Sequence, residues 1–260
     1  MSHMTQMTHI VFIVGMAGSG KSTLTAAYLE WLKNGDRDVL VVNLDPGATA
    51  LPYNPDIDSR RYVDVEKLML DYQLGPNGAL IMASDLLADH LEEIRGEIEQ
   101  ANPDVVLVDT PGQIELFAFR EGGRFLARNL TEDNRAVIYL MDAPFSRSPL
   151  NFTSNVYLAA AIYSRIMQPQ VYALSKSDLI TEHEIDEIVS WATEPEAFDL
   201  ALRTLGEQNL SIITRDLANS VFRSGLLTEP IPVSARANSG FVELNAAITR
   251  ILNLGEEESS

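Results

Sequence analysis

The chain has 260 residues, of which 46% are hydrophobic, so it can bury a sizeable core within one domain. Its formal net charge of −18 argues against direct binding of nucleic acid or of an anionic membrane surface. It has no cysteine, which excludes disulfides and thiolate metal sites, and no apolar run long enough to span a membrane. We therefore expect a cytoplasmic protein whose partners are other proteins.

Short β-rich runs alternate with helical stretches along the chain. Apolar and β-branched runs predict strands at 9–14, 38–44, 104–109, 136–142, 170–174 and 230–235. Helices are predicted at 23–33, 64–72 and 84–101, the last because apolar residues recur three and four positions apart. This alternation predicts an α/β fold with a mostly parallel sheet, helices on both faces, and ligands bound at the carboxyl ends of the strands.

We expect a single domain over residues 9–254. Residues 1–8 are interpreted as an expression tag, and residues 255–260 as an acidic tail that frays in solvent. Two segments interrupt the alternation of strands and helices. Residues 45–80 contain four prolines, and residues 181–228 form a helical insertion before the last predicted strand.

The segment GMAGSGKST follows the first predicted strand and opens the first predicted helix, as the phosphate-loop pattern G-x4-G-K-[ST] requires. Its glycines let backbone N–H groups turn towards an anion, and the helix N-terminus favours negative charge. Lys21 is expected to reach the β- and γ-phosphates of a nucleotide, and Ser22 to offer its hydroxyl to Mg²⁺. The predicted nucleotide-binding residues of this loop are Gly15, Gly18, Ser19, Gly20, Lys21, Ser22 and Thr23.

Aspartates at the ends of two of the predicted strands are candidates for metal binding. Asp109 ends the strand at 104–109, and a carboxylate in that place beside a phosphate loop holds Mg²⁺ directly or through a water. Asp45 follows the second strand, whose end we expect to lie beside the phosphate loop. It is a second candidate contact for Mg²⁺ or for the attacking water. The alternative is that Asp45 only forms an Asx turn before Pro46.

The loop after Asp109 reads Thr-Pro-Gly-Gln-Ile-Glu. The N–H of Gly112 is expected to contact a γ-phosphate, which would make this loop sensitive to hydrolysis. Gln113 and Glu115 follow at once and are candidates to orient the attacking water.

The strand at 170–174 is followed by Ser-Lys-Ser-Asp, and the last strand contains Val-Ser-Ala. A carboxylate at Asp178 accepts both the N1–H and N2–H of guanine, whereas adenine presents no such pair of donors. The stem of Lys176 is expected to lie over the base, and the N–H of Ala235, next to Ser234, to meet guanine O6. The usual first residue of this signature is Asn, so Ser175 removes an amide that braces the pocket. Ser175 is thus the best support for an alternative, an ATPase or a small-molecule kinase.

Residues Gly75-Pro76-Asn77-Gly78 predict a tight turn. Pro76 presets φ at the second turn position, Asn77 tolerates the third, and Gly78 closes the turn.

The order of these motifs resembles that of the GPN-loop GTPases, a family of archaeal and eukaryotic P-loop proteins named for this tripeptide. The resemblance covers about residues 9–254, and Gly75-Pro76-Asn77 is its specific mark. It implies a homodimer in which the GPN loop of one subunit enters the nucleotide site of the other. Asn77 would then be offered in trans to the phosphate and the water. It also implies that Gln113 positions the water.

The resemblance and the motifs together predict a Mg²⁺-dependent GTPase that hydrolyses GTP to GDP and phosphate. Because eukaryotic members are linked to RNA polymerase assembly and import, a nucleotide-gated switch or assembly factor is a second, compatible expectation. Pro76 stiffens the loop and Gly75 allows close backbone approach, but an uncharged Asn77 predicts slow turnover without a helper. Catalytic roles are thus assigned to Asn77, Gln113, Asp45, Lys21, Gly75, Pro76 and Glu115, and metal binding to Ser22, Asp109 and Asp45.

Overall fold

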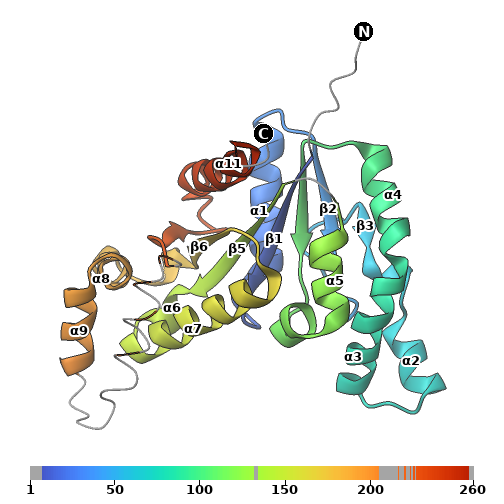
Figure 1. Ribbon diagram of the computed structural model, residues 1–260, viewed down its shortest axis with the longest axis horizontal. Coiled ribbons are helices and arrows are strands. Elements are labelled where there is room, and N and C mark those ends of the chain that lie inside the picture. Colours follow the sequence, from blue (N-terminus) through green and yellow to red (C-terminus); the bar gives the residue numbers. More distant parts are fainter. Residues whose placement is uncertain are drawn as a thin grey trace.

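A computed structural model describes residues 8–131, 134–204 and 227–257, together with Asp216, Ser220, Arg223 and Gly225. Within these residues, seven strands form one sheet in the order β3-β2-β4-β1-β5-β6-β7, and all neighbours run parallel (Figure 1). This confirms the predicted α/β fold class. The strands are β1 (His9–Gly15), β2 (Val39–Asn43), β3 (Ile57–Asp58), β4 (Val105–Asp109), β5 (Arg135–Asp142), β6 (Gln170–Ser175) and β7 (Ile231–Val233).

Helices cover both faces of the sheet (Figure 1). One face packs against α1 (Lys21–Asn34) and α11 (Phe241–Glu257), and the other against α3 (Pro76–Leu86), α4 (Leu91–Ala101), α5 (Glu121–Asn129) and α7 (Pro149–Ile166). Along β1, Val11 and Ile13 join the first core, whereas Ile10 and Phe12 join the second. Because both faces are buried, these strands appear in the sequence as continuous apolar runs rather than as an alternating pattern.

The central position of β1 decides where a ligand can bind. β4 pairs with one edge of β1 and β5 with the other, so the loops after β4 and β5 flank the loop that follows β1. In open parallel sheets, such a point beyond the carboxyl ends is where ligands bind. The second strand does not pair with β1, because β4 lies between β2 and β1, but the charge of Asp45 still acts on Lys21 of the phosphate loop.

The predicted tight turn at residues 75–78 is also wrong, because these residues start a helix. Gly75 is the N-cap of α3, with extended backbone angles (φ −71°, ψ 167°), and Pro76 is the first helical residue. The N–H of Ala79 donates to the Gly75 carbonyl oxygen at 3.0 Å, which closes the first helical turn. Proline suits this position because its fixed φ is helical and its missing N–H would have no partner there.

The helix predicted at 84–101 is three elements. α3 ends at Leu86, a 3₁₀ segment covers Leu87–His90, and α4 begins at Leu91. Leu87, Leu91, Ile94 and Ile98 are all buried, so the apolar spacing identified the buried face correctly but not the helix boundaries. The two-residue strand β3, the 3₁₀ turn Ser59–Arg61 and α2 (Val65–Asp71) fill the proline-rich segment. Strand β3 is too short for periodicity to predict it.

The insertion begins with two helices, α8 (Glu182–Thr193) and α9 (Pro195–Thr204). Thr181 and Glu184 form a reciprocal capping box at the start of α8. Trp191 and Phe198 pack their rings against Phe152 of α7, with ring centroids 5.7 Å apart in both pairs. The first half of the predicted insertion is therefore helical and packed on the main core, whereas most of residues 205–226 lie outside the described part of the chain.

The ends of the chain differ from the expectation. Thr8, assigned to the tag, is buried, and its hydroxyl donates to the Pro103 carbonyl oxygen at 2.9 Å. α11 continues to Glu257, into the segment expected to fray. Residues 1–7 and 258–260 are outside the described part. No helix among the described residues is long and apolar enough to cross a membrane.

Candidate functional site

The phosphate loop joins β1 to α1. Gly18 and Gly20 have φ values of +79° and +96°, in the left-handed region that glycine adopts without strain. A Cβ atom on Gly15 would lie 2.6 Å from Ser19 Oγ and 2.9 Å from Leu140 Cβ, so only glycine fits there. The loop is thus a tight backbone cradle that ends at a helix N-terminus, as an anion site requires.

Lys21 is folded into this cradle. Its ammonium group donates to the Gly15 and Met16 carbonyl oxygens at 3.0 and 3.1 Å, and the residue is 6% exposed. Burial lowers the pKa of Lys21, while the charges of Asp109 and Asp45 oppose that shift. The loop therefore holds a buried amine between backbone carbonyls and two carboxylates, where phosphate oxygens would be strong acceptors.

Asp109 ends β4 beside this amine and is 1% exposed. Burial raises its pKa, against hydrogen bonding by Ser22 and Tyr53 and the charge of Lys21, which lower it. The Tyr53 hydroxyl donates to Asp109 Oδ2 at 2.8 Å. Asp109 Oδ1 is buried and makes no well-formed hydrogen bond within the described residues, although the Ser22 hydroxyl faces the same carboxylate.

Asp45 connects two loops at the neighbouring strand end. Its Oδ1 accepts from the Gly47 N–H at 2.9 Å, which is the Asx turn. Its Oδ2 accepts from the Gly112 N–H at 3.1 Å. Asn43 holds the Asp45 backbone, accepting from its N–H and donating to its carbonyl oxygen. The Asx turn weighed for Asp45 is therefore present, and the same carboxylate also reaches the loop after β4.

The residues at this strand edge fit a magnesium ion. Ser22, Asp109 and Asp45 offer hard oxygen donors, and the buried Oδ1 of Asp109 makes no well-formed hydrogen bond in the described part of the chain. Across the described residues, no three His, Cys, Asp or Glu side chains are grouped to hold a metal. That donor set suits Mg²⁺, which keeps several waters and takes further ligands from phosphates.

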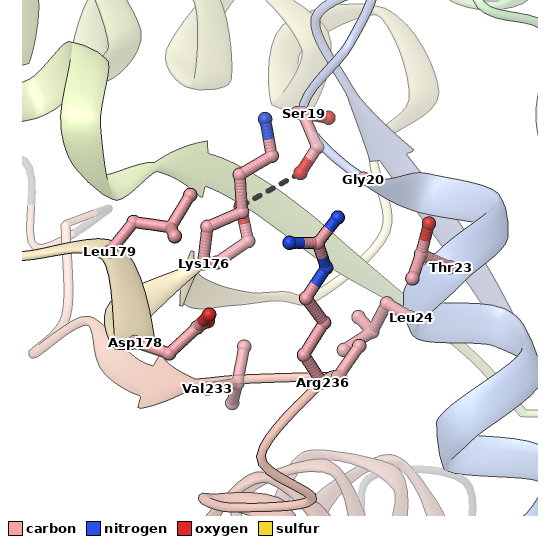
Figure 2. Close-up of a pocket in the computed structure, with 11 residues that line it drawn as sticks. Ser19, Gly20, Thr23, Leu24, Lys176, Asp178, Leu179, Val233 and Arg236 are labelled. Carbon is pink, nitrogen blue, oxygen red and sulfur yellow. Dashed lines mark hydrogen bonds between the residues drawn. The ribbon is translucent and has the colours of Figure 1, made fainter.

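A cavity of about 240 Å³ lies beside the phosphate loop, between α1 and the loops after β6 and β7 (Figure 2). Asp178 Oδ1 accepts from the Ser234 hydroxyl at 2.6 Å, and Ser234 Oγ accepts in turn from the Ala237 N–H at 3.0 Å. The carboxylate is therefore fixed in orientation before any ligand enters. The lining residues are Ser19, Gly20, Thr23, Leu24, Ser175, Lys176, Asp178, Leu179, Val233, Ala235 and Arg236.

Ser175 and Lys176 tie the loop after β6 to the phosphate loop. The Ser175 hydroxyl lies 2.8 Å from the Ser19 carbonyl oxygen and 3.2 Å from that of Met141. Lys176 donates to the Gly18 carbonyl oxygen and to Asp142 Oδ2, both at 2.6 Å. The amide usual at this position is absent, as the sequence indicates, but the Ser175 hydroxyl supplies a hydrogen bond to the phosphate loop.

Three polar residues at or beside the site were not predicted. Asp142 ends a predicted strand, a signal as strong as the one that identified Asp109. Arg236 follows Val-Ser-Ala directly, and its side chain points into the cavity towards Lys176 and Gly20 (Figure 2). Tyr53 carries no such signal, because it lies in a proline-rich segment and only the fold brings it to Asp109.

The GPN tripeptide does not line the cavity. Gly75, Pro76 and Asn77 are exposed, and the Asn77 carboxamide makes no hydrogen bond within the described part of the chain. Helix α3 lies at the side of the molecule that carries β2 and β3, whereas the cavity lies towards β6 and β7 (Figure 1). Gln113 and Glu115 are also exposed, at the start of the π-helical segment Glu115–Phe119.

Comparison with known proteins identifies related sequences. A family model described as a conserved hypothetical ATP binding protein matches residues 13–254. A GPN-loop GTPase from Pyrococcus abyssi is 40% identical over 178 residues, which cover 67% of this chain and 70% of the relative. GPN-loop GTPase QQT2 from Arabidopsis thaliana is 34% identical over 212 residues, covering 80% of this chain and 54% of the relative. GPN-loop GTPase 1 from Dictyostelium discoideum is 31% identical over 236 residues, covering 90% and 59%.

The chain thus spans little more than half the length of the last two relatives. Its fold matches the crystal structure of a GTPase in apo form from Pyrococcus abyssi with a TM-score of 0.81 and 30% identity. That match covers 94% of this chain and 97% of the other. Sequence and structure agree over nearly the whole described chain, and we conclude that it belongs to the GPN-loop GTPase family.

Proposed function

We propose that this chain is a Mg²⁺-dependent GTPase that hydrolyses GTP to GDP and phosphate. The observation that supports this most directly is the Asp178 carboxylate, fixed by Ser234 at the edge of the cavity beside the phosphate loop. A fixed anion recognises two adjacent N–H donors, which guanine has and adenine lacks. The relatives are named GTPases, whereas the family model is named for ATP. Competition of unlabelled ATP and GTP for a fluorescent GDP analogue tests the choice, and equal competition would favour the ATPase or kinase.

The phosphates are proposed to displace the contacts that Lys21 now makes. Its ammonium group, already buried between two loop carbonyls, would turn from them towards β- and γ-phosphate oxygens. Ser22 and Asp109, with Asp45, would hold a Mg²⁺ ion, which neutralises charge that develops on the phosphates. Exposed Gln113, with Glu115 behind it, would orient the water. The chain's own contribution is therefore placement and electrostatics rather than covalent chemistry.

The hydrogen bond between Asp45 and Gly112 supports a nucleotide-dependent change. The Gly112 N–H that a γ-phosphate needs is bound to Asp45 Oδ2 in this structure. Two anions cannot share one donor without repulsion, so a γ-phosphate would release Asp45 from Gly112. We propose that this exchange couples residues 45–80 to the presence of the γ-phosphate. Solution scattering curves of the GDP and GTP-analogue forms that superimpose within error would contradict such a switch.

We further propose that the active form is a homodimer in which Asn77 acts in trans. The carboxamide is exposed at the N-terminus of α3 and makes no hydrogen bond with the described residues, which supports this, since it is available to a second molecule. It can donate to a phosphate oxygen and accept from a water. A partner protein that recognises the GTP form, as in RNA polymerase assembly, is the proposed use of the switch. The net charge of −18 favours a protein partner over nucleic acid.

Complementation tests the trans arrangement. Asn77→Ala removes the donated group but leaves its own nucleotide loop intact, and Lys21→Ala does the reverse. If Asn77 acts in trans, each mixed dimer has one complete site, so an equal mixture recovers about a quarter of the wild-type sites. If Asn77 acts within its own chain, mixing recovers nothing. Asn34→Ala, an exposed asparagine at the far end of α1, is the control and should keep wild-type turnover.

A further inference from the structure

Tyr53 contacts Asp109 although the two residues are 56 positions apart in the sequence. It lies between β2 and β3, in the proline-rich segment, yet its ring is buried at 9% exposure in the core under α1. Its hydroxyl donates to Asp109 Oδ2 at 2.8 Å. Burying a tyrosine hydroxyl is costly unless it has a partner, so this bond is part of what holds the segment in place.

The bond leaves the two oxygens of Asp109 unequal. Oδ2 is occupied by Tyr53, whereas Oδ1 is buried and has no well-formed hydrogen bond within the described residues. A carboxylate with one anchored oxygen cannot rotate freely, so Oδ1 keeps one direction. Groups that hydrogen-bond to metal ligands orient them in this way, and their loss typically weakens metal affinity about 10- to 100-fold.

We propose that Tyr53 is a positioning residue for the metal site: its hydroxyl holds Asp109 Oδ2 so that Oδ1 is presented to Mg²⁺ at the nucleotide phosphates. This rests on the proposed function, because it needs Mg²⁺ to bind beside the phosphate loop. In this role Tyr53 contacts neither nucleotide nor metal. It acts only through Asp109.

The same bond ties the metal carboxylate to the segment that leads to the GPN helix. Asp45 and Gly47 begin this segment, and Gly47 lies so close to Leu80 of α3 that a Cβ atom there would be 2.5 Å from Leu80 Cδ2. Tyr53 therefore fixes one end of a packed connection between Asp109 and α3. Tyr53 contacts Asp109 and Gly47 lies against Leu80, so one segment of the chain touches both this carboxylate and the helix that begins with the tripeptide.

The test compares Tyr53→Phe with Tyr28→Phe. Tyr28 belongs to the same core and is 1% exposed, and its hydroxyl donates to Asn245 Oδ1 at 2.9 Å, away from the metal residues. Each variant therefore loses one buried tyrosine hydroxyl and keeps its ring. The readout is the Mg²⁺ concentration at which release of a fluorescent GDP analogue slows half-maximally, with affinity in EDTA measured alongside. For Tyr53→Phe we expect that midpoint to rise about tenfold or more with EDTA affinity unchanged, and for Tyr28→Phe no change.

The outcomes separate the two claims. If wild type and Tyr28→Phe respond to Mg²⁺ and Tyr53→Phe responds at the same midpoint, the role of Tyr53 is refuted while the proposed function stands. If wild-type release does not depend on Mg²⁺, the proposed metal dependence fails and this inference with it. Should Tyr53→Phe not fold, a crystal structure of wild type with Mg²⁺ and a GTP analogue decides. A Tyr53 hydroxyl still bonded to Asp109 supports the proposal, and a displaced one overturns it.

Discussion

Ser175 offers a direct test of how the base cavity is joined to the phosphate loop. Its hydroxyl lies 2.8 Å from the Ser19 carbonyl oxygen, and the residue is 4% exposed. Ser175→Ala removes this hydroxyl and leaves a cavity smaller than a methyl group. The change therefore isolates one hydrogen bond between β6 and the phosphate loop.

The expected magnitude follows from the chemistry of the bond. A neutral intramolecular hydrogen bond contributes about 1 kcal/mol net, and a buried carbonyl left without a partner costs roughly 1–3 kcal/mol. We expect Ser175→Ala to lower the free energy of unfolding by about 1–3 kcal/mol, or the melting temperature by about 2–4 °C per kcal/mol. Because the bond braces the phosphate loop, GDP affinity should also fall by about 3- to 10-fold, since tenfold corresponds to about 1.4 kcal/mol.

Ser84→Ala is the matched control. Ser84 is also 4% exposed, and its hydroxyl donates to a carbonyl oxygen distant in sequence, that of Leu116 at 3.3 Å, but it does not line the cavity. Melting temperatures from thermal unfolding and GDP affinities from fluorescence titration are measured for both variants. Ser84→Ala should lose stability and keep its GDP affinity.

The reasoning is refuted if Ser175→Ala binds GDP as tightly as wild type while losing stability like Ser84→Ala. In that case the hydroxyl contributes to the fold alone, and the serine does not replace the bracing amide that the signature usually carries.

Three further predictions concern Asp178, Gly240 and Asp58. Asp178→Asn should lower GTP affinity about 10- to 100-fold, because it replaces a charged acceptor with a neutral one. The weak competition by ATP should be unchanged, and a parallel loss of affinity for both nucleotides would contradict base recognition by Asp178. Gly240→Ala should destabilise the fold by roughly 2–5 kcal/mol in denaturant unfolding, since φ is +81° and the new Cβ would lie 2.0 Å from the Pro232 carbonyl oxygen; a loss below about 1 kcal/mol would show that the loop relaxes. The pKa of Asp58 is lowered: burial acts to raise it, but hydrogen bonding, chiefly by Arg60, and the charge of Arg60 together outweigh burial. The ionised Asp58 therefore stabilises the fold above its unfolded pKa of about 4, and this stabilisation is lost as the pH falls through the folded pKa. Unfolding measured at several pH values should therefore show the stability gap between wild type and Asp58→Asn closing on acidification, and a constant gap would be inconsistent with this.

The nucleotide site shows where local sequence was sufficient. The phosphate loop was predicted because its glycines and Lys21 act through backbone geometry between adjacent residues, and the structure places them at the end of β1 as expected. Asp109 was predicted because a strand end is a local feature. The base cavity needed only two short segments, and the structure brings Asp178 and Ser234 into contact at 2.6 Å.

Other features depended on contacts that local patterns do not carry. Gly75-Pro76 is compatible with both a turn and a helix start, and burial of Ala79 and Ala83 against the core decides for the helix. The sequence around Asp45 does not show that β4, rather than β2, lies next to β1, because strand order depends on how the whole sheet packs.

By itself, the sequence determined the parallel α/β class, the phosphate loop and the residues at most strand ends, because these depend on residue spacing and backbone preferences. Only the tertiary structure decided that Ser175 braces the phosphate loop, that Asp45 binds the Gly112 N–H, and that Tyr53 meets Asp109. In each of these hydrogen bonds the two residues are at least 56 positions apart in the sequence. No local sequence pattern records which distant groups the packed core brings within hydrogen-bonding distance.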